Sequence, residues 1–310
     1  MKKFVIVADA TCDLGNDYQE KYDIKVLRSH VLKPDGKEFR SLFSWDEIGR
    51  EDFYKDLKKN PDGYSTAPAN VQEFTEVFTK YIEEGCDILC MTISSGISGT
   101  YGFACSARDA VLEANPDANI KVIDTLRFGP GFGLMTVCAA ALRDEGYGLD
   151  TVAQYVETNK NRFHQAGWLD DLSFVAKKGR MTHGKAFMGQ LIGLKPIGEF
   201  DYNGMTTVIG KIKGEKKAYE VLMHYIEETI ENPSEQIIFI AQTNRLPQAE
   251  KYKAMIEEKF KPKAVVIRDV FPACGVNIGP GLMAAYYMGT PISEDLGREK
   301  AIVEKYSAAE

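Results

Sequence analysis

Basic residues and long apolar runs are in short supply in this chain of 310 residues. Lysine and arginine number 38 against 45 aspartates and glutamates, which gives a formal net charge of −7. General nucleic-acid-binding proteins need a basic face to neutralise phosphates, so we expect no nucleic-acid partner. No stretch of about eighteen apolar residues occurs, so the sequence predicts no membrane-spanning helix and no integral membrane association.

The six cysteines form neither a disulfide framework nor a metal-binding pattern. They are scattered among apolar neighbours, which favours reduced, buried thiols and a cytoplasmic location. Cys86 and Cys90 lie four residues apart with no histidine nearby, so we expect no metal ion there. The opening sequence MKKFVIVADA has an apolar run too short for a signal peptide, and we expect an N-terminal strand instead.

The chain is long enough for two domains, and 44% of its residues are hydrophobic, which suffices for a sizeable core. In the first half, buried-strand patterns at 4–8, 24–27, 86–93 and 120–125 alternate with helical patterns at 16–22, 44–59, 69–85, 100–115 and 129–146. A turn at Pro34-Asp35-Gly36 predicts a small hairpin, and Ser44 with Glu47 predicts the N-terminal cap of the helix at 44–59. The alternation predicts an α/β domain with a mainly parallel sheet, spanning residues 1–155.

The second half, residues 156–310, predicts an α+β domain with a mixed sheet. Asn203-Gly204 between two alternating runs indicates an antiparallel hairpin with a two-residue turn. Strands are expected at 236–242 and 264–270, and helices at 214–230 and 247–260. The sequence GPGLMAAYYMG at 279–289 is expected to begin a helix, like the earlier GPG at 129–131.

Three loops follow the predicted parallel strands of the first half, where α/β sheets bind ligands. The middle loop lies within TISSGISGTY at 92–101, which carries hydroxyls and glycines but no lysine, arginine or histidine. Free backbone N–H groups and hydroxyls there suit a carboxylate or a neutral hydroxyl, although the serines could simply cap the following helix. The phosphate-binding loop and the dinucleotide fingerprint are both absent.

Two further features of the sequence each allow a structural and a ligand-binding interpretation. Arg180, in KKGRM, could offset a helix C-terminus or reach the cleft between the domains as a fixed cation. The Met- and Phe-bearing segments KAFMGQLIGL (185–194) and GLMAAYYMG (281–289) could line an apolar pocket or form plain core. The loop also lacks the second glycine of G-x-S-x-G, but a serine–histidine couple assembled in space remains an alternative.

Seven segments, taken in order, resemble the DegV family of bacterial fatty-acid-binding proteins. They are VADATCDL, YSTAPA, ISSGISGTYGFACSA, VIDT with the glycine-rich loop that follows it, LDDLSFVAKKGRM, LIGLKPI and GVNIGPG. The resemblance implies a two-domain α/β fold with a long acyl chain buried between the domains and no metal or other cofactor. It also implies a carrier rather than an enzyme, which presents its fatty acid to a separate fatty-acid kinase for acyl-phosphate formation and phospholipid metabolism.

The same resemblance assigns roles to individual residues. The ligand carboxylate would be held by the hydroxyls of Ser65, Thr66, Ser94 and Ser95. Further candidates for the pocket or the head group are Thr11, Gly96, Ser98, Thr125, Arg180 and Asn277.

Two positions depart from the family pattern. Asn277 stands where the family usually has histidine, and Lys213 stands where an arginine is common, and both are associated with the head group or the kinase handover. The alternatives are a serine-dependent acyl hydrolase or a phosphotransferase-type enzyme, and a lipid-sensing module without kinase handover.

Overall fold

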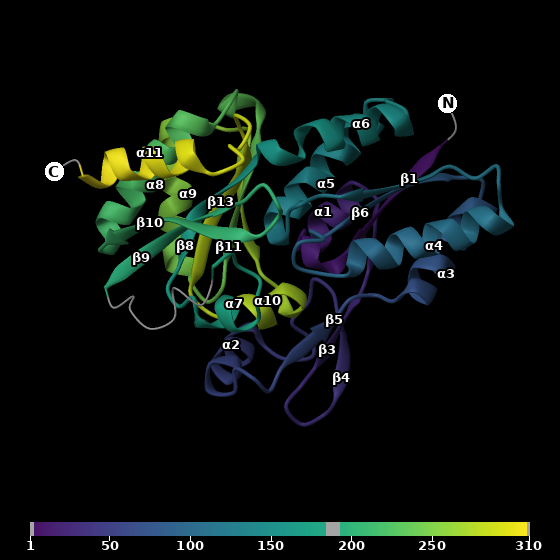
Figure 1. Cartoon of the computed structure of the whole chain (residues 1–310), viewed down its shortest axis with the longest axis horizontal. Coiled ribbons are helices and arrows are strands. Elements are labelled where there is room, and N and C mark those ends of the chain that lie inside the picture. The colour runs from purple at the N-terminus through teal and green to yellow at the C-terminus, as the bar shows by residue number, and fades with distance from the viewer. Residues whose placement is uncertain (1–2, 184–192, 309–310) are drawn as a thin grey trace.

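The structure, a computed structural model, describes residues 3–183 and 193–308 and contains three sheets (Figure 1). The Met- and Phe-bearing segment at 185–194 therefore lies largely outside the described residues. Sheet A is four-stranded and wholly parallel, in the order β2 (Ile24–Leu27), β1 (Phe4–Asp9), β6 (Asp87–Thr92) and β7 (Ile120–Asp124). This confirms the predicted N-terminal strand and the mainly parallel sheet of the first half.

Helices cover both faces of sheet A, because its strands are apolar on both sides. The helices of the first half are α1 (Asn16–Lys21), α2 (Arg50–Lys59), α3 (Val71–Glu83), α4 (Thr100–Ala114), α5 (Gly129–Asp144) and α6 (Leu149–Asn159). A separate apolar cluster joins α3 and α4 to one face of the sheet, while α5 and α6 pack on the other. Asn70 and Glu73 form a capping box at the start of α3.

A small excursion between β2 and α3 carries sheet B, in the order β4 (Glu38–Ser41), β3 (Ser29–Leu32) and β5 (Ser65–Ala67). The predicted hairpin at Pro34-Asp35-Gly36 is confirmed as the β3–β4 connection. The predicted cap at Ser44 is wrong, since α2 begins at Arg50 after Gly49. The indole of Trp45 instead donates a hydrogen bond to Asp269, 2.9 Å away, and this long-range contact prevails over the local capping signal.

The second half contains a six-stranded mixed sheet, sheet C, as predicted. Its order is β10 (Thr206–Lys213), β9 (Leu194–Phe200), β8 (Phe163–Leu169), β13 (Leu282–Met288), β11 (Ile237–Gln242) and β12 (Ala264–Asp269). The remaining helices are α7 (Ser173–Lys177), α8 (Glu215–Thr229), α9 (Leu246–Phe260), α10 (Pro272–Ile278) and α11 (Gly297–Ala308). Among the described helices, none has both the length and the hydrophobicity to cross a membrane.

The helix predicted at 279–289 is wrong, because this segment forms the central strand β13. It pairs antiparallel with β8 on one side and β11 on the other, and its first six residues are buried. A continuous apolar run gives no periodicity by which a buried strand could be told from a buried helix. The hairpin at Asn203-Gly204 is confirmed between β9 and β10, but its turn is wider than two residues, since Asp201 N–H bonds the carbonyl of Met205.

Helix α5 lies between sheets A and C and joins the two halves into one apolar core. Eleven of its sixteen residues are buried. Two glycines allow this close approach: a Cβ on Gly133 would lie 2.2 Å from the carbonyl oxygen of Cys12, and one on Gly131 would lie 2.8 Å from the ring of Tyr286. The predicted division at residue 155 falls within α6, and the two-part division into 1–155 and 156–310 stays a proposal.

Candidate functional site

A cavity of about 160 Å³ opens where the loops after β1 and β6 meet β5 of sheet B and helix α10. It lies at the carboxyl ends of two neighbouring parallel strands, the position predicted for a ligand site. Its polar lining consists mainly of hydroxyls, one amide and one guanidinium. We call this the hydroxyl cavity; its polar and sulfur-bearing lining residues are Thr11, Ser29, Thr66, Ser98, Thr100, Arg180, Cys274 and Asn277.

Two lining residues of the hydroxyl cavity, one from each half of the chain, are joined by a hydrogen bond. The side-chain Nδ2 of Asn277, on α10, donates to the Oγ1 of Thr66, on β5, over 3.1 Å. Because this bond uses a lone pair of the Thr66 hydroxyl, its O–H remains available to donate to a ligand. Asn277 thereby fixes the direction of a donor that lines the cavity.

The loop after β6 brings a second pair of hydroxyls to the cavity. The Oγ of Ser98 and the Oγ1 of Thr100 are 2.7 Å apart, and the backbone N–H of Thr100 donates to Ser98 over 3.4 Å. Thr100 is the first residue of α4, so these groups lie at the positive end of a fifteen-residue helix. This arrangement favours a negatively charged group in the cavity.

The loop after β1 is fixed by a buried carboxylate. Asp9 accepts hydrogen bonds from the backbone N–H and the hydroxyl of Thr11 and from the backbone N–H of Ile93, the last over 2.9 Å. Burial raises the pKa of the Asp9 carboxyl, and these hydrogen bonds partly oppose the rise. Asp9 therefore ties the loop after β1 to the loop after β6, and both line the cavity.

Arg180 supplies the one charged side chain among the described lining residues. Its guanidinium donates to the carbonyl oxygen of Lys178, and this bond holds it at the cavity. Both roles left open by the sequence are present, since Lys178 is the C-terminal cap of α7 and Arg180 also lines the cavity.

An apolar pocket adjoins the hydroxyl cavity and shares three of its walls, Phe128, Val175 and Ile278. It encloses about 40 Å³ between α7 and the strands β8, β9 and β10 of sheet C. We call it the inner pocket; its other lining residues are Gln165, Gly167, Trp168, Leu169, Leu172, Pro196, Gly198, Thr206, Val208 and Leu282. The shared walls make the two spaces neighbours, one polar and one largely apolar.

The candidate residues from the sequence divide into two groups. Thr11, Thr66, Ser98, Arg180 and Asn277 line the hydroxyl cavity. Ser65, Ser94, Ser95, Gly96, Thr125 and Lys213 do not line it.

Strand geometry separates Ser65 from Thr66, because neighbouring residues of a strand point to opposite faces. The loop after β6 separates its serines in another way: Ser94 is fully buried and accepts a hydrogen bond from the backbone N–H of Gly96. Ser95 is exposed, and its backbone N–H donates to Asp124.

Gly96 and Thr125 have positions that shape the loops. A Cβ on Gly96 would lie 2.4 Å from the carbonyl oxygen of Asn203, so the β9–β10 turn packs directly on this loop. The buried hydroxyl of Thr125 donates to the carbonyl oxygen of Thr92 over 2.8 Å. Lys213 is exposed at the end of β10.

Sequence reasoning missed Ser29, Thr100 and Cys274 as lining residues. Thr100 belongs to the hydroxyl-rich loop and could have been selected with Ser98. Ser29 and Cys274 carry no local signal, because only the pairing of β3 with β5 and the packing of α10 bring them to the cavity.

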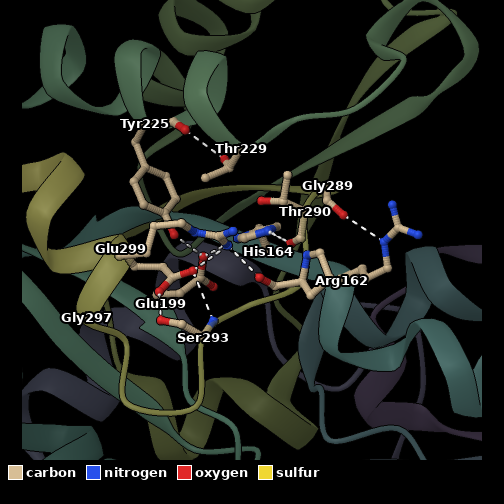
Figure 2. A network of polar contacts seen from close by, with 12 residues as sticks. Arg162, His164, Glu199, Tyr225, Thr229, Gly289, Thr290, Ser293, Gly297 and Glu299 are labelled. Carbon is tan, nitrogen blue, oxygen red and sulfur yellow. Dashed lines mark hydrogen bonds and ion pairs between the residues drawn. The ribbon is translucent and has the colours of Figure 1, made fainter.

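A second polar cluster lies within the second half, around His164 and Glu199 (Figure 2). The Nδ1 of His164 lies 2.8 Å from Glu199 and its Nε2 lies 2.7 Å from the carbonyl oxygen of Thr290. Glu199 also accepts from the hydroxyl of Tyr225 and the backbone N–H of Gln165, each over 2.7 Å. Since the ring and the carboxylate are both buried with their polar atoms paired, this cluster holds β8, β9 and α8 together.

The histidine hydrogen-bond contacts found among the described residues are to carboxylates and to one backbone carbonyl. None of the hydrogen bonds found for their histidines involves a serine hydroxyl. No group of three or more histidine, cysteine, aspartate or glutamate side chains within residues 3–183 and 193–308 is arranged to hold a metal ion.

Comparison with known proteins identifies the family. The family model described as DegV matches residues 3–289. The chain belongs to the DegV family. A DegV domain-containing protein of Clostridium perfringens is 33% identical over 289 residues, covering 93% of this chain and 98% of that relative.

Solved DegV structures share the fold. A DegV family protein from Thermus thermophilus, described by its fatty acid binding, superposes with a TM-score of 0.83 at 22% identity, covering 93% of this chain and 100% of that one. One from Eubacterium eligens, described as loaded with heptadecanoic acid, has a TM-score of 0.80 at 22% identity and covers 93% and 100%. Bacillus subtilis DegV, described as a fatty acid binding protein, has a TM-score of 0.77 at 22% identity and covers 94% and 100%.

Proposed function

We propose that this DegV protein binds a long-chain fatty acid, with the carboxylate in the hydroxyl cavity and the acyl chain in the inner pocket. The observation that carries the proposal is the pair of adjoining spaces, one lined by hydroxyls and the other largely by apolar side chains. The solved DegV structures described as holding fatty acids support the same ligand class.

The head group requires donors, because a carboxylate taken out of water loses its hydration. Thr66 offers an O–H directed by Asn277, and the Ser98–Thr100 pair offers a second hydroxyl donor. Arg180 adds a charge-assisted donor. We therefore assign the carboxylate to these residues and a structural role in the surrounding loops to Ser94, Gly96 and Thr125.

The acyl chain supplies most of the affinity, at roughly 0.8 kcal/mol for each buried methylene. The two spaces are narrow, so a long chain has to displace the shared walls Phe128, Val175 and Ile278 as it enters. These side chains are held by packing alone and carry no polar group that such a movement would leave unpaired.

We further propose that the bound acid is presented to a separate fatty-acid kinase. Asn277 lines the cavity and Lys213 is exposed, and both positions carry family substitutions. The lysine keeps its charge but loses the two-pronged geometry of arginine, while the asparagine cannot carry a positive charge. On these grounds we expect slower transfer than a protein with arginine and histidine would show.

The test of lipid binding is native mass spectrometry of the purified protein, followed by titration of delipidated protein with palmitate and stearate. One tightly bound acyl chain per protein is the expected result. Failure to take up either acid would contradict the proposal. Covalent labelling of Ser98 by a fluorophosphonate would favour the serine hydrolase instead.

A further inference from the structure

A polar side chain lies in the inner pocket among largely apolar neighbours. Gln165, on β8, is 5% exposed and lines this pocket beside Trp168 and Gly198. Such a residue is informative because a buried amide normally has partners for both its donor and its acceptor.

The oxygen of the Gln165 amide has a partner. Its Oε1 accepts a hydrogen bond from the hydroxyl of Tyr286 over 3.1 Å, within the core of sheet C. The backbone N–H of Gln165 donates to Glu199 over 2.7 Å, so the residue is anchored at both ends. The side chain is therefore positioned by neighbouring strands and not by the pocket.

The nitrogen of the amide has no such partner. Across residues 3–183 and 193–308, no hydrogen-bond acceptor is paired with Gln165 Nε2. A Cβ added to Gly198 would lie 3.2 Å from this Nε2, which places the donor against a wall of the inner pocket that has no side chain. The nitrogen is not fully buried, so it borders the open space of the inner pocket and can donate to a group that enters there.

We propose that the inner pocket selects acyl chains that carry a hydroxyl group opposite Gln165. This inference rests on the proposed fatty-acid binding and adds the class of chain. A chain hydroxyl accepts from Nε2 in the present orientation of the amide. If the amide is turned over, Tyr286 accepts from Nε2 and the hydroxyl donates to Oε1, so a hydroxyl fits both orientations. A keto or epoxy oxygen fits only the first.

The experiment compares delipidated protein bound to stearic acid with the same protein bound to stearic acids hydroxylated near the carboxylate, at mid-chain and at the methyl end. We expect one positional isomer to bind on the order of tenfold more tightly than stearic acid, the gain from one well-placed hydrogen bond to the Gln165 amide. Gln165→Leu should bring this ratio close to one, by weakening the hydroxylated ligand and strengthening stearic acid.

Two further variants separate the amide from general damage to the fold. Tyr286→Phe leaves Gln165 in place but frees its Oε1, and should reduce the preference. Gln154→Leu makes the same chemical change on the exposed face of α6, and should leave the ratio at its wild-type value. Thermal melting of each variant shows whether it is folded, and Gln165→Met serves as a second substitution if the leucine variant is not.

Two outcomes would overturn the inference. Equal affinity of the wild-type protein for stearic acid and for every isomer means that the amide is satisfied by a trapped water, and fatty-acid binding would stand. A preference that persists in Gln165→Leu means that another group selects the hydroxyl. If neither stearic acid nor any isomer binds, the proposed function itself fails, and this result is distinct from the other two.

Discussion

Asn277 of α10 and Thr66 of β5, 211 residues apart in the chain, both line the hydroxyl cavity and are joined by a hydrogen bond of 3.1 Å. The bond links the second half to sheet B and orients the Thr66 hydroxyl. The bond makes Asn277 a positioning group for a neighbouring donor, at a position where the sequence resemblance leads us to expect histidine.

Asn277→Ala should weaken fatty-acid binding by about tenfold. Without Asn277 the Thr66 hydroxyl is no longer held in one direction, so the carboxylate of the ligand loses a well-placed donor. Thr66→Val should have a similar effect, and the double variant should be little worse than either single one. Titration of delipidated protein with palmitate measures all three. Ser65→Ala is the matched control, and an equal loss there would show that our assignment of the head group is wrong.

Gly198→Ala should shift the preference toward shorter acyl chains. A methyl group there would lie 3.2 Å from Gln165 and 3.4 Å from the Thr206 side chain, and would fill part of the inner pocket. We expect stearate affinity to fall by roughly tenfold, with laurate nearly unaffected. Gly102→Ala on α4 is the control, since a Cβ there meets open space. A uniform loss for both chain lengths would contradict an acyl chain beside Gly198.

Asp13→Asn should stabilise the protein at neutral pH. Asp13 has φ 46°, a conformation that asparagine adopts readily, and its Oδ1 accepts from the backbone N–H of Phe271 over 3.0 Å. Its buried Oδ2 has no hydrogen-bond partner among the described residues. Replacing this unpaired atom with an amide should raise the free energy of unfolding by about 1 kcal/mol or more.

The pH dependence of this effect has a definite sign. Burial raises the pKa of Asp13 well above its ordinary value. The folded protein therefore binds a proton at Asp13 more tightly than the unfolded chain does. The stability of the wild-type protein is unaffected by this difference below the unfolded pKa of Asp13, and falls as the pH rises from there toward the folded pKa. The advantage of the asparagine variant should grow from about pH 4 upward in urea titrations. A difference in unfolding free energy that stays constant across that range would mean that the ionisation of Asp13 is not its cause.

His30 should stabilise the protein more at low pH than at high pH. Its Nδ1 lies 2.5 Å from Glu38 and its Nε2 lies 3.2 Å from Glu73, which also pairs with Arg40. The hydrogen bond to Glu38, reinforced by Glu73 and opposed by burial and by Arg40, raises the pKa of His30. The folded pKa exceeds the unfolded one, so the contribution is complete below about pH 6.5 and disappears at higher pH.

The measurement is the free energy of unfolding of the wild-type protein and of His30→Gln, from urea titrations between pH 5 and 9. The gap between the two should be widest at the acid end, on the order of 1 kcal/mol, and should narrow as the imidazole loses its proton. His224→Gln, on α8, removes a half-buried imidazole that pairs with one carboxylate, Glu227, over 3.2 Å, and serves for comparison with His30, which lies near two. A gap that widens with pH would contradict the proposed role.

The four strands of sheet A and the helices α1, α3, α4 and α5 could be predicted from the sequence because their periodicities are clear, whereas the short strand β5 and the helix α6 were not predicted. The two GPG motifs show the limit of such reasoning. One begins the buried helix α5 and the other precedes the buried strand β13, and both runs are largely apolar. The second segment becomes a strand because it pairs with β8 and β11 in sheet C, and this pairing cannot be read from the segment's own sequence.

The site shows the same limit at the level of single residues. The sequence indicated the hydroxyl-bearing loops, and the structure places Thr66 and Ser98 at the cavity. It could not indicate that strand alternation turns Ser65 away or that the loop buries Ser94. Ser29 reaches the cavity only through the pairing of β3 with β5, which links residues far apart in the chain.

The position of α5 has a consequence for how a ligand enters. Because Gly133 of this helix packs on the turn after β1 and Gly131 packs on β13 of sheet C, the two halves cannot separate as rigid bodies without exposing the shared core. A ligand must therefore enter through local rearrangement of the residues that line the hydroxyl cavity, and the rate of ligand uptake should depend on motion of these side chains and loops. If the backbone is cleaved near its middle, we expect both halves to unfold together in a single cooperative transition, because they share one core.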